Sequence, residues 1–266
     1  MFTIIGERIN ATRPAIMAAV EKRDTETIRQ EAIKQTEAGA NYLDVNAGSR
    51  PGLISADMAW LTEVVQDAVA TPICLDSPDP AILQQAYGLV NQKPLINSIS
   101  LESNRFQPML SFLKGKDCSI IALCLDDRSP PKTPEEVIDR AGLIIAGLEG
   151  IGFDRARIHI DPLIQPAAVD VNAGLNAVRA IQGILKKYPG VHITCGLSNI
   201  SFGLPHRQAI NRILLPVLMT AGLDGAILDP LDDKIRSTLI ISKMILGQDR
   251  FCREYTRTAR ARGIVV

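Results

Sequence analysis

The stretch His192-Ile193-Thr194-Cys195-Gly196-Leu197-Ser198-Asn199 contains the pattern that predicts the fold of the whole chain. Its first four residues are typical of a buried strand, because they combine β-branched side chains with an apolar cysteine. The strand opens into a loop of small residues, and a helix is expected from about Pro205. The loop presents Asn199, whose amide can donate and accept hydrogen bonds without titrating near neutral pH. Asn199 is therefore a candidate functional residue; the alternative is an asparagine that only forms its own turn.

The same pattern, a short apolar run that stops at a polar residue before a helix-like segment, recurs along the chain. Eight such strand ends fall near residues 8, 46, 76, 97, 126, 161, 199 and 229. They span 221 residues in seven intervals, or about 32 residues per unit, as expected for a (β/α)8 barrel, the TIM-barrel fold of the α/β class. The nearly continuous apolar strands suit a parallel sheet that is buried on both faces. A doubly wound open sheet is the alternative, but no G-x-G-x-x-G follows the first strand.

The segments between the strands carry signals for helix starts and stops. In Thr133-Pro134-Glu135-Glu136, the threonine can cap a helix, the proline suits the first position, and the acids lie at the positive end of the helix dipole. No linker or low-complexity segment divides the chain, so residues 1–266 are expected to form one domain. The expected helices are residues 25–38, 55–70, 79–90, 101–114, 133–150, 174–187, 208–221 and 232–246, and a tail of mixed charge follows them.

Composition argues against several classes of partner and location. The chain has 266 residues, with 29 basic and 29 acidic side chains, so neither nucleic acid nor an anionic membrane surface is expected as the main partner. No apolar run reaches the roughly 18 residues of a membrane-spanning helix. The first eight residues lack the features of a secretory signal, so a cytoplasmic protein is expected.

No metal site is predicted. The five cysteines are scattered without a C-x-x-C pair and are expected to be reduced thiols, mostly packed as small hydrophobic residues. A zinc site from Cys74, Cys124 and Cys195 is disfavoured because local ligand pairs are missing. The three histidines lack the spacing of metal ligands, and His206 is expected at the surface.

Polar residues at the strand ends form the candidate site, because a TIM barrel builds its active site at the carboxyl ends of its strands. Any one of them could simply form a turn or cap a helix. As a set they are rich in hydrogen-bond acceptors and poor in Lys and His. They could bind a hard cation or a heterocycle with several N–H donors, and the amides among them favour the heterocycle. The set is Glu7, Asp44 or Asn46, Asp76, Asn97, Asp126, Asp161, Asn199 and Asp229.

Motifs along the whole chain resemble those of the pterin-binding barrels, and most closely the methyltetrahydrofolate:corrinoid methyltransferases of anaerobic bacteria. The resemblance implies a TIM barrel, usually a homodimer, that binds a reduced folate at the strand ends. The motifs are Ile5-Gly6-Glu7-Arg8-Ile9-Asn10, Leu43-Asp44-Val45-Asn46, Leu75-Asp76-Ser77, Ile96-Asn97-Ser98, Asp161-Pro162-Leu163 and Gly196-Leu197-Ser198-Asn199-Ile200-Ser201.

The resemblance also implies roles for individual residues. Asp76 and Asp161 match carboxylates that accept hydrogen bonds from the N–H groups of the pterin, and Asn97 matches the amide that pairs with its pyrimidine edge. Asn199 matches the catalytic amide near N5, the atom that carries the methyl group. Phe202 stands where the family has a polar residue, so packing is expected there in place of a hydrogen bond. The other implied folate-binding residues are Glu7, Asn46, Gly196, Ser198, Arg207 and Ile227.

The implied reaction is methyl transfer between N5 of tetrahydrofolate, as 5-methyltetrahydrofolate, and the cobalt of a corrinoid in the one-carbon metabolism of an anaerobe. The cobalamin is expected on a partner protein, because the chain lacks the D-x-H-x-x-G motif of cobalamin modules. Pro130, Pro131 and the loop after Asp161 are the expected docking face. The alternatives are a dihydropteroate synthase, whose basic residues on the last two strand ends are missing here, a non-catalytic folate-binding barrel, and a metal-dependent hydrolase.

Overall fold

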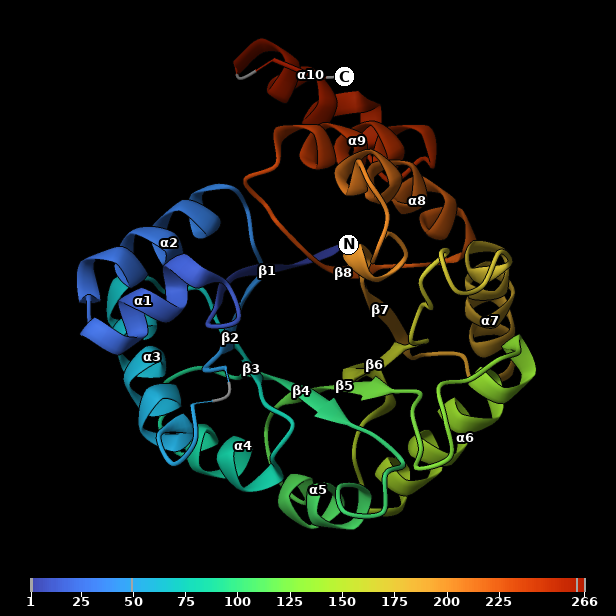
Figure 1. Cartoon of the computed structure of the whole chain (residues 1–266). Helices are drawn as coiled ribbons and strands as arrows, with labels where there is room; N and C mark the ends of the chain where they lie inside the picture. The colour runs from blue at the N-terminus through green and yellow to red at the C-terminus, as the bar shows by residue number, and fades with distance from the viewer. Residues whose placement is uncertain (1, 49, 262, 266) are drawn as a thin grey trace.

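The eight expected strands form a closed barrel in which each strand is parallel to its neighbours, which confirms the predicted (β/α)8 fold (Figure 1). The computed structural model describes residues 2–48, 50–261 and 263–265. The strands follow one another around the barrel in chain order. They are β1 (Thr3–Asn10), β2 (Tyr42–Asn46), β3 (Ile73–Asp76), β4 (Leu95–Ile99), β5 (Ser119–Leu123), β6 (Ile158–Asp161), β7 (His192–Gly196) and β8 (Gly225–Leu228).

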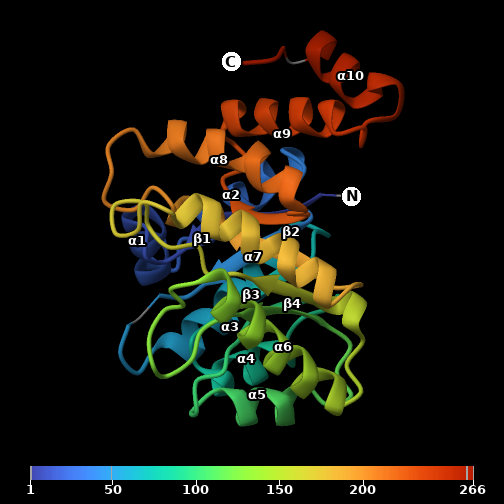
Figure 2. The same ribbon diagram turned by 90° about the vertical axis from the view of Figure 1, so that its right-hand side faces the viewer.

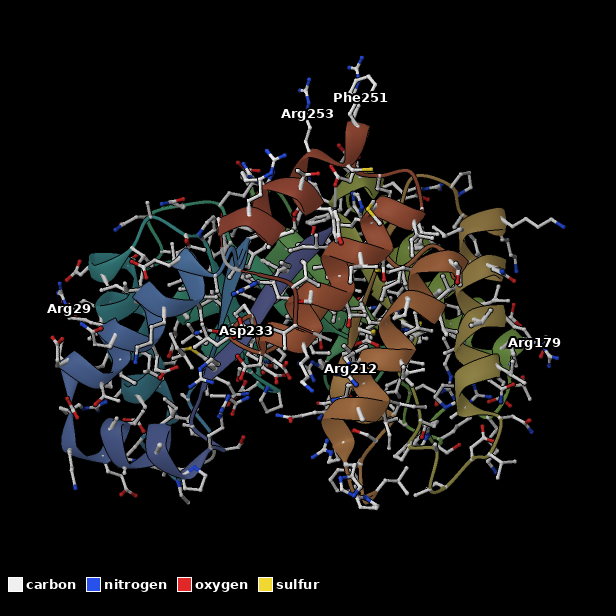
Figure 3. All side chains as sticks on the ribbon, turned by 90° about the horizontal axis from the view of Figure 1, so that it is seen from above. Arg29, Arg179, Arg212, Asp233, Phe251 and Arg253 are labelled. Atoms are coloured by element: carbon white, nitrogen blue, oxygen red, sulfur yellow. The ribbon has the colours of Figure 1, made fainter. Side chains whose placement is uncertain are left out.

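A ring of helices surrounds the barrel (Figure 1), and the labelled side chains of Arg29 and Arg179 point away from it (Figure 3). The eight helices expected from the sequence correspond to α2–α9, with ends that differ by a few residues. The helices are α1 (Pro14–Lys22), α2 (Thr25–Glu37), α3 (Ile54–Ala68), α4 (Pro80–Tyr87), α5 (Phe106–Leu113), α6 (Pro134–Gly150), α7 (Ala173–Lys187), α8 (Arg207–Ala221), α9 (Asp233–Ile245) and α10 (Arg253–Ala261).

The strand register sorts the barrel residues into two faces. Ile5 pairs with Tyr42 on β2 and with Ile227 on β8, and these three side chains belong to a small apolar cluster inside the barrel. Alternate residues such as Leu43 and Ile96 belong to the larger core between the barrel and the helices. Full burial of one such side chain stabilises the fold by about 1.5–3 kcal/mol. Because side chains alternate along a strand, inward residues beyond the apolar cluster lie at the carboxyl end of the barrel, where the site forms.

Three features at the two ends of the chain differ from the sequence-based expectation. Strand β1 continues to Asn10, with an irregularity between Gly6 and Ile9, where a shorter strand was expected. Helix α1 follows it directly. Helix α10 replaces part of the expected tail and lies on the outer side of α9 (Figure 2), where Lys243 and Glu254 form an ion pair. None of the residues of α10 is buried, so no apolar stripe marks this helix in the sequence.

In the described part of the chain, the search for a helix long and apolar enough to cross a membrane finds none.

Candidate functional site

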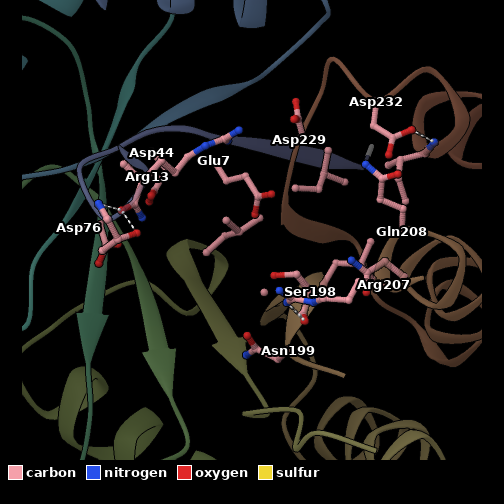
Figure 4. A pocket seen from close by; sticks show the side chains of 18 of the residues that line it. Glu7, Arg13, Asp44, Asp76, Ser198, Asn199, Arg207, Gln208, Asp229 and Asp232 are labelled. Carbon is pink, nitrogen blue, oxygen red and sulfur yellow. Dashed lines mark hydrogen bonds between the residues drawn. The ribbon is translucent and has the colours of Figure 1, made fainter. Parts of the chain in front are cut away.

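A cavity of about 650 Å³ opens at the carboxyl ends of the strands, and most of the predicted site residues line it (Figure 4). Its walls come from the ends of β1–β4 and β6–β8, the loops that follow β1 and β7, and the first turn of α8. The predicted residues that line it are Glu7, Asp76, Asn97, Asp161, Gly196, Ser198, Asn199, Arg207 and Ile227, and Asp44 and Asp229 lie among them.

Register brings these side chains to one level of the barrel. Asn46 pairs with Asp76, and Asp76 with Asn97, across three neighbouring strands. On the other side, Gly196 pairs with Ile227. The acid and amide groups therefore lie on the inward face, two residues further along each strand than the apolar cluster. There they form the floor of the cavity.

Asn46 holds Asp76 in place and does not itself line the cavity. Its Nδ2 donates a hydrogen bond of 2.7 Å to Asp76 Oδ2, and its Oδ1 accepts one of 2.7 Å from the backbone N–H of Gly48. Burial raises the pKa of Asp76, while the bond from Asn46 and the charge of Arg105 work against that rise. The implied contact between Asn46 and a folate stays a prediction, and the geometry gives Asn46 a supporting position.

Asp44, which the sequence left as an alternative to Asn46, lines the cavity. The residue is 2% exposed, and its Oδ1 has no hydrogen-bond partner among the described residues. Burial and the neighbouring charge of Asp76 raise the pKa of Asp44 well above its usual range. Asp44 is therefore held in the protonated state more readily than an ordinary carboxyl, and can offer an O–H to a ligand.

Asp161 ends β6 and is almost fully buried. Its Oδ1 accepts a hydrogen bond of 2.8 Å from the backbone N–H of Leu163, which adopts a left-handed conformation with φ 55°. Burial raises the pKa of Asp161 to about 6, against the hydrogen bonds from the backbone of Leu163 and Gly196. At neutral pH this carboxylate is mostly charged and can accept hydrogen bonds from a ligand.

Asn199 ends a short 3-10 turn, Leu197–Asn199, that follows β7. A Cβ on Gly196 would lie 3.4 Å from both Nδ2 and Oδ1 of Asn199, so the amide rests over this glycine. Arg207 fixes the turn, because its Nη2 donates to the Ser198 carbonyl at 2.9 Å and its Nε to Ser201 Oγ at 3.2 Å. The amide of Asn199 forms no hydrogen bond with another described residue, so it can bond to a ligand.

Glu7 lies on the opposite wall, beside Asp229. Asp229 is engaged, because Arg8 Nη1 donates to it at 2.9 Å and Arg8 also pairs with Glu31 at 2.6 Å. Burial and the charge of Asp229 raise the pKa of Glu7, while Arg13, Arg207 and Arg8 lower it. Arg13 lines the cavity and was not expected there, since a lone arginine in a loop gives no signal in the sequence.

Besides Asn46, two further expected positions lie outside the cavity, Phe202 and Asp126. Phe202 is 66% exposed, and the Arg207 guanidinium lies 5.9 Å from its ring centre. Asp126 was expected in the ring of strand-end residues, and that expectation is wrong. It pairs with Arg140 at 2.9 Å and with Arg128 at 2.6 Å, because β5 ends at Leu123 and the chain has left the barrel by then.

Cysteines and histidines take no part in the cavity wall. Cys74, Cys118, Cys124 and Cys195 are buried, which confirms their expected packing, and Cys252 is exposed. His206 is exposed, as expected. Within the described ranges, the search for groups of three or more His, Cys, Asp or Glu able to hold a metal ion finds none.

Comparison with known proteins relates this chain to pterin-binding enzymes. Residues 6–229 match the family described as "Pterin binding enzyme". The methylcorrinoid:tetrahydrofolate methyltransferase of Eubacterium limosum is 37% identical over 259 residues, which cover 97% of this chain and 96% of that protein. The methionine synthase of Mycobacterium tuberculosis is 32% identical over 239 residues, 84% of this chain but only 20% of that protein.

Solved structures with the same fold include the dihydropteroate synthase of Xanthomonas albilineans in complex with 7,8-dihydropteroate. It has a TM-score of 0.72 and 16% identity, and covers 92% of both chains. The dihydropteroate synthase of Burkholderia cenocepacia has a TM-score of 0.71 and 18% identity, with 94% of both chains covered. At such low identity these structures establish a shared fold and no shared activity.

Proposed function

Because this chain belongs to the family of pterin-binding enzymes, we propose that it is a methyltransferase that moves a methyl group between N5 of tetrahydrofolate and the cobalt of a corrinoid. The observation that carries the proposal is the cavity lined with acids and amides at the carboxyl end of the barrel, in a chain similar over nearly its whole length to a methylcorrinoid:tetrahydrofolate methyltransferase. The same chemistry was expected from the sequence motifs.

The pterin ring fits the floor of the cavity. A tetrahydropterin presents an N3–H and a 2-amino group along one edge, with a 4-oxo group beside them. Asp76 and Asp161 supply carboxylates for the N–H groups, and Asn97 supplies an amide that can pair with a carbonyl or an N–H. Hydrogen bonds to a carboxylate are roughly twice as strong as neutral ones, so the two acids dominate the affinity.

Asn199 is placed to assist the chemical step. A tertiary amine is a poor leaving group, so N5 must gain positive charge before the bond to the methyl carbon breaks. An enzyme accelerates this step only if it binds the charged state better than the ground state. The Asn199 amide has no partner within the described part of the chain and can hydrogen-bond N5 in either direction of transfer.

The corrinoid reaches the folate from the open mouth of the cavity. We propose that a separate protein carries the cobalamin and covers the rim beside Asn199. The loop after β6 contains Val169 and Val171, which are 81% and 93% exposed, and the Ala167 N–H ties this loop to the Ile200 carbonyl at 2.9 Å. Exposed apolar side chains next to a reaction site suit a surface that a partner covers during turnover. Pro130, on the neighbouring loop, is exposed as well, whereas Pro131, which was expected on the same face, is buried.

An assay with free cobalamin tests the function. The purified protein is incubated with methylcobalamin and tetrahydrofolate, and in the reverse direction with reduced cobalamin and 5-methyltetrahydrofolate. We expect transfer that depends on the protein, measured by the absorbance change of the cobalamin and by chromatography of the folate. Tight folate binding without transfer in either direction would leave a non-catalytic folate-binding barrel. Formation of dihydropteroate from a pterin pyrophosphate and 4-aminobenzoate would support the synthase alternative.

We also propose that the enzyme is a cytoplasmic homodimer that serves one-carbon metabolism. These statements follow from the family resemblance. Light scattering of the purified protein tests the first of them, because a dimer has twice the mass of the chain.

A further inference from the structure

We propose that the carboxyl group of Glu7 exchanges the proton with N5 of the folate during methyl transfer. The proposal rests on the proposed function and adds the group that supplies and removes the proton, which Asn199 cannot do because an amide does not titrate near neutral pH.

The position of Glu7 is the first argument. Ile5, two residues earlier on β1, pairs with Ile227 inside the barrel, so Glu7 lies on the same inward face at the level of the cavity. Glu7 lines the cavity together with Asn199 and Ile227. In Figure 4 it lies between Asp44 and Asp76 on one side and Ser198 and Arg207 on the other.

The contacts of the other carboxyl groups are the second argument. Asp76 accepts a hydrogen bond from Asn46, and Asp161 accepts one from the backbone of Leu163. Asp229 is paired with Arg8. Two further carboxyls line the cavity. Asp44 Oδ1 has no hydrogen-bond partner among the described residues, but Asp44 is 2% exposed, so its burial leaves the side chain little room to move. Asp232 caps α9 by accepting from the backbone N–H groups of Lys234 and Ile235 at 2.9 and 3.1 Å.

Glu7 differs from these acids. Within the described part of the chain, the Glu7 carboxylate forms no hydrogen bond and no ion pair. Its longer side chain can also change rotamer at the cavity surface without breaking an existing contact. A carboxyl that must pick up and release a proton needs this freedom, whereas a carboxyl that recognises the pterin edge needs to be held still.

The charges around Glu7 suit a proton donor. Asp229 faces it from the end of β8, and Arg13, Arg207 and Arg8 face it from the loop before α1, from α8 and from β1 itself. Asp44 on β2 is close enough that the charge of Glu7 contributes to the raised pKa of Asp44. Burial and Asp229 outweigh the three arginines and raise the pKa of Glu7 above its ordinary value. A raised pKa brings a carboxylic acid closer to neutral pH, where general acids are most effective.

The proton balance can be written for both directions. From 5-methyltetrahydrofolate, Glu7 gives its proton to N5, cobalt(I) attacks the methyl carbon, and the electron pair of the broken C–N bond stays on N5. The products are tetrahydrofolate with an N5–H, a methyl group on cobalt(III), and a Glu7 carboxylate that water reprotonates. In the other direction the N5 lone pair attacks the methyl carbon, the Co–C electron pair returns to cobalt as cobalt(I), and the Glu7 carboxylate removes the proton from N5.

The test is the pH profile of kcat/KM with free cobalamin for the wild type and Glu7→Gln. We expect the variant to lose about 100- to 10,000-fold in transfer. Its Kd for 5-methyltetrahydrofolate, measured by calorimetry at neutral pH, is expected to change by only about threefold, as for the loss of one weak contact. In the wild type the rate from 5-methyltetrahydrofolate falls above the pKa of Glu7, and this alkaline decline is absent from the variant. Glu63→Gln, at an exposed position on the outer side of α3, is the matched control.

Asp229→Asn provides a second, independent readout. It removes the negative charge that raises the pKa of Glu7, and it leaves Arg8 with one acidic partner, Glu31. Both effects lower the pKa of Glu7, so the alkaline decline moves to lower pH, which a merely structural role of Glu7 does not produce.

The proposal is overturned if Glu7→Gln keeps the wild-type pH profile or a rate within about threefold of it, or if Asp229→Asn leaves the decline in place. If the wild type transfers no methyl group at all, the proposed function fails and this inference with it. If transfer proceeds without dependence on Glu7, only this inference fails.

Discussion

Asn46 and Asp76 stand opposite each other on β2 and β3, and Asn46 Nδ2 donates a hydrogen bond of 2.7 Å to Asp76 Oδ2. The bond favours the charged form of Asp76 in a place where burial disfavours it. Asn46, which lies outside the cavity, thus helps to keep Asp76 inside the cavity in the charged form that accepts hydrogen bonds from a pterin.

Asn46→Ala is expected to weaken folate binding at neutral pH by about tenfold, the effect of losing one hydrogen bond to a charged group. The loss raises the pKa of Asp76, so the defect grows as the pH is lowered toward 5. Calorimetric Kd values for 5-methyltetrahydrofolate at pH 7.5 and at pH 5.5 measure it. Asn91→Ala, at an exposed position, is the control. Equal affinity of wild type and Asn46→Ala at both pH values would show that the bond does not tune the site.

Asn199→Ala is expected to keep the fold, weaken folate binding and slow transfer by about 10- to 1000-fold, the range for one electrostatic contact to a developing charge. The amide has no partner within the described chain to lose, so thermal stability should match the wild type. Single-turnover rates with free cobalamin and a thermal melt check the two expectations. An unchanged turnover number removes Asn199 from the mechanism.

The buried carboxylate of Asp161 is expected to destabilise the folded protein at neutral pH, although we propose that it is needed for folate binding. Its pKa is raised from 3.8 to about 6, so between those values the folded protein binds more protons than the unfolded chain. Stability therefore falls as the pH rises through this window, and the full penalty, on the order of 3 kcal/mol, applies above pH 6. Asp161→Asn keeps an oxygen for the Leu163 N–H and is expected to be more stable than the wild type at pH 8, with a smaller gain at pH 4.5.

Urea unfolding of both proteins at the two pH values measures the difference. The same variant is expected to lose most of its affinity for the folate at pH 8, since a charged acceptor is replaced by a neutral amide. A stability gain that is equal at both pH values would contradict the assignment of the raised pKa to Asp161.

Gly6 lies in the first of the motifs and is required for packing. A Cβ at this position would lie 2.4 Å from Oε1 of Gln35, which is fully buried and accepts a hydrogen bond of 3.1 Å from the Arg8 N–H. Gly6→Ala is expected to destabilise the fold by about 2–3 kcal/mol, because it displaces a buried hydrogen-bonded side chain. Gly174→Ala is the matched control: no atom lies within 4 Å of its added Cβ, and alanine stabilises the helix by roughly 0.5–1 kcal/mol. A similar free energy of unfolding for both variants would refute the packing argument.

The barrel was predictable because each of its eight units repeats one local signal, an apolar strand followed by a polar residue and a helix. The end of β5 shows the limit of that signal. Asp126 follows an apolar run as Asp161 does, but its strand ends earlier and its carboxylate meets Arg140, a contact with a residue 14 positions away that no local pattern encodes.

The choice between Asp44 and Asn46 shows a second limit. Asp44 and Asn46 are two residues apart on β2, so both side chains point into the barrel. The alternation of side chains along the strand therefore does not tell which of them lines the cavity and which hydrogen-bonds to Asp76. The depth of Asp44 and the bond from Asn46 to Asp76 depend on how neighbouring strands are staggered. Arg13 was missed for a related reason, because the loop that carries it reaches the cavity only through the longer β1.

Arg207 and Phe202 are expected to behave differently although both were assigned to the folate site. Arg207 donates to the Ser198 carbonyl and to Ser201 Oγ, and so fixes the turn that carries Asn199. Arg207→Met keeps the apolar stem but removes these bonds, and is expected to lower kcat/KM with free cobalamin by about tenfold or more. Phe202→Ala removes a ring that is 66% exposed and outside the cavity, and is expected to stay within about threefold of the wild type. Steady-state kinetics of the two variants decide the matter: a larger loss for Phe202→Ala would mean that the ring turns into the cavity and packs on the folate when it binds.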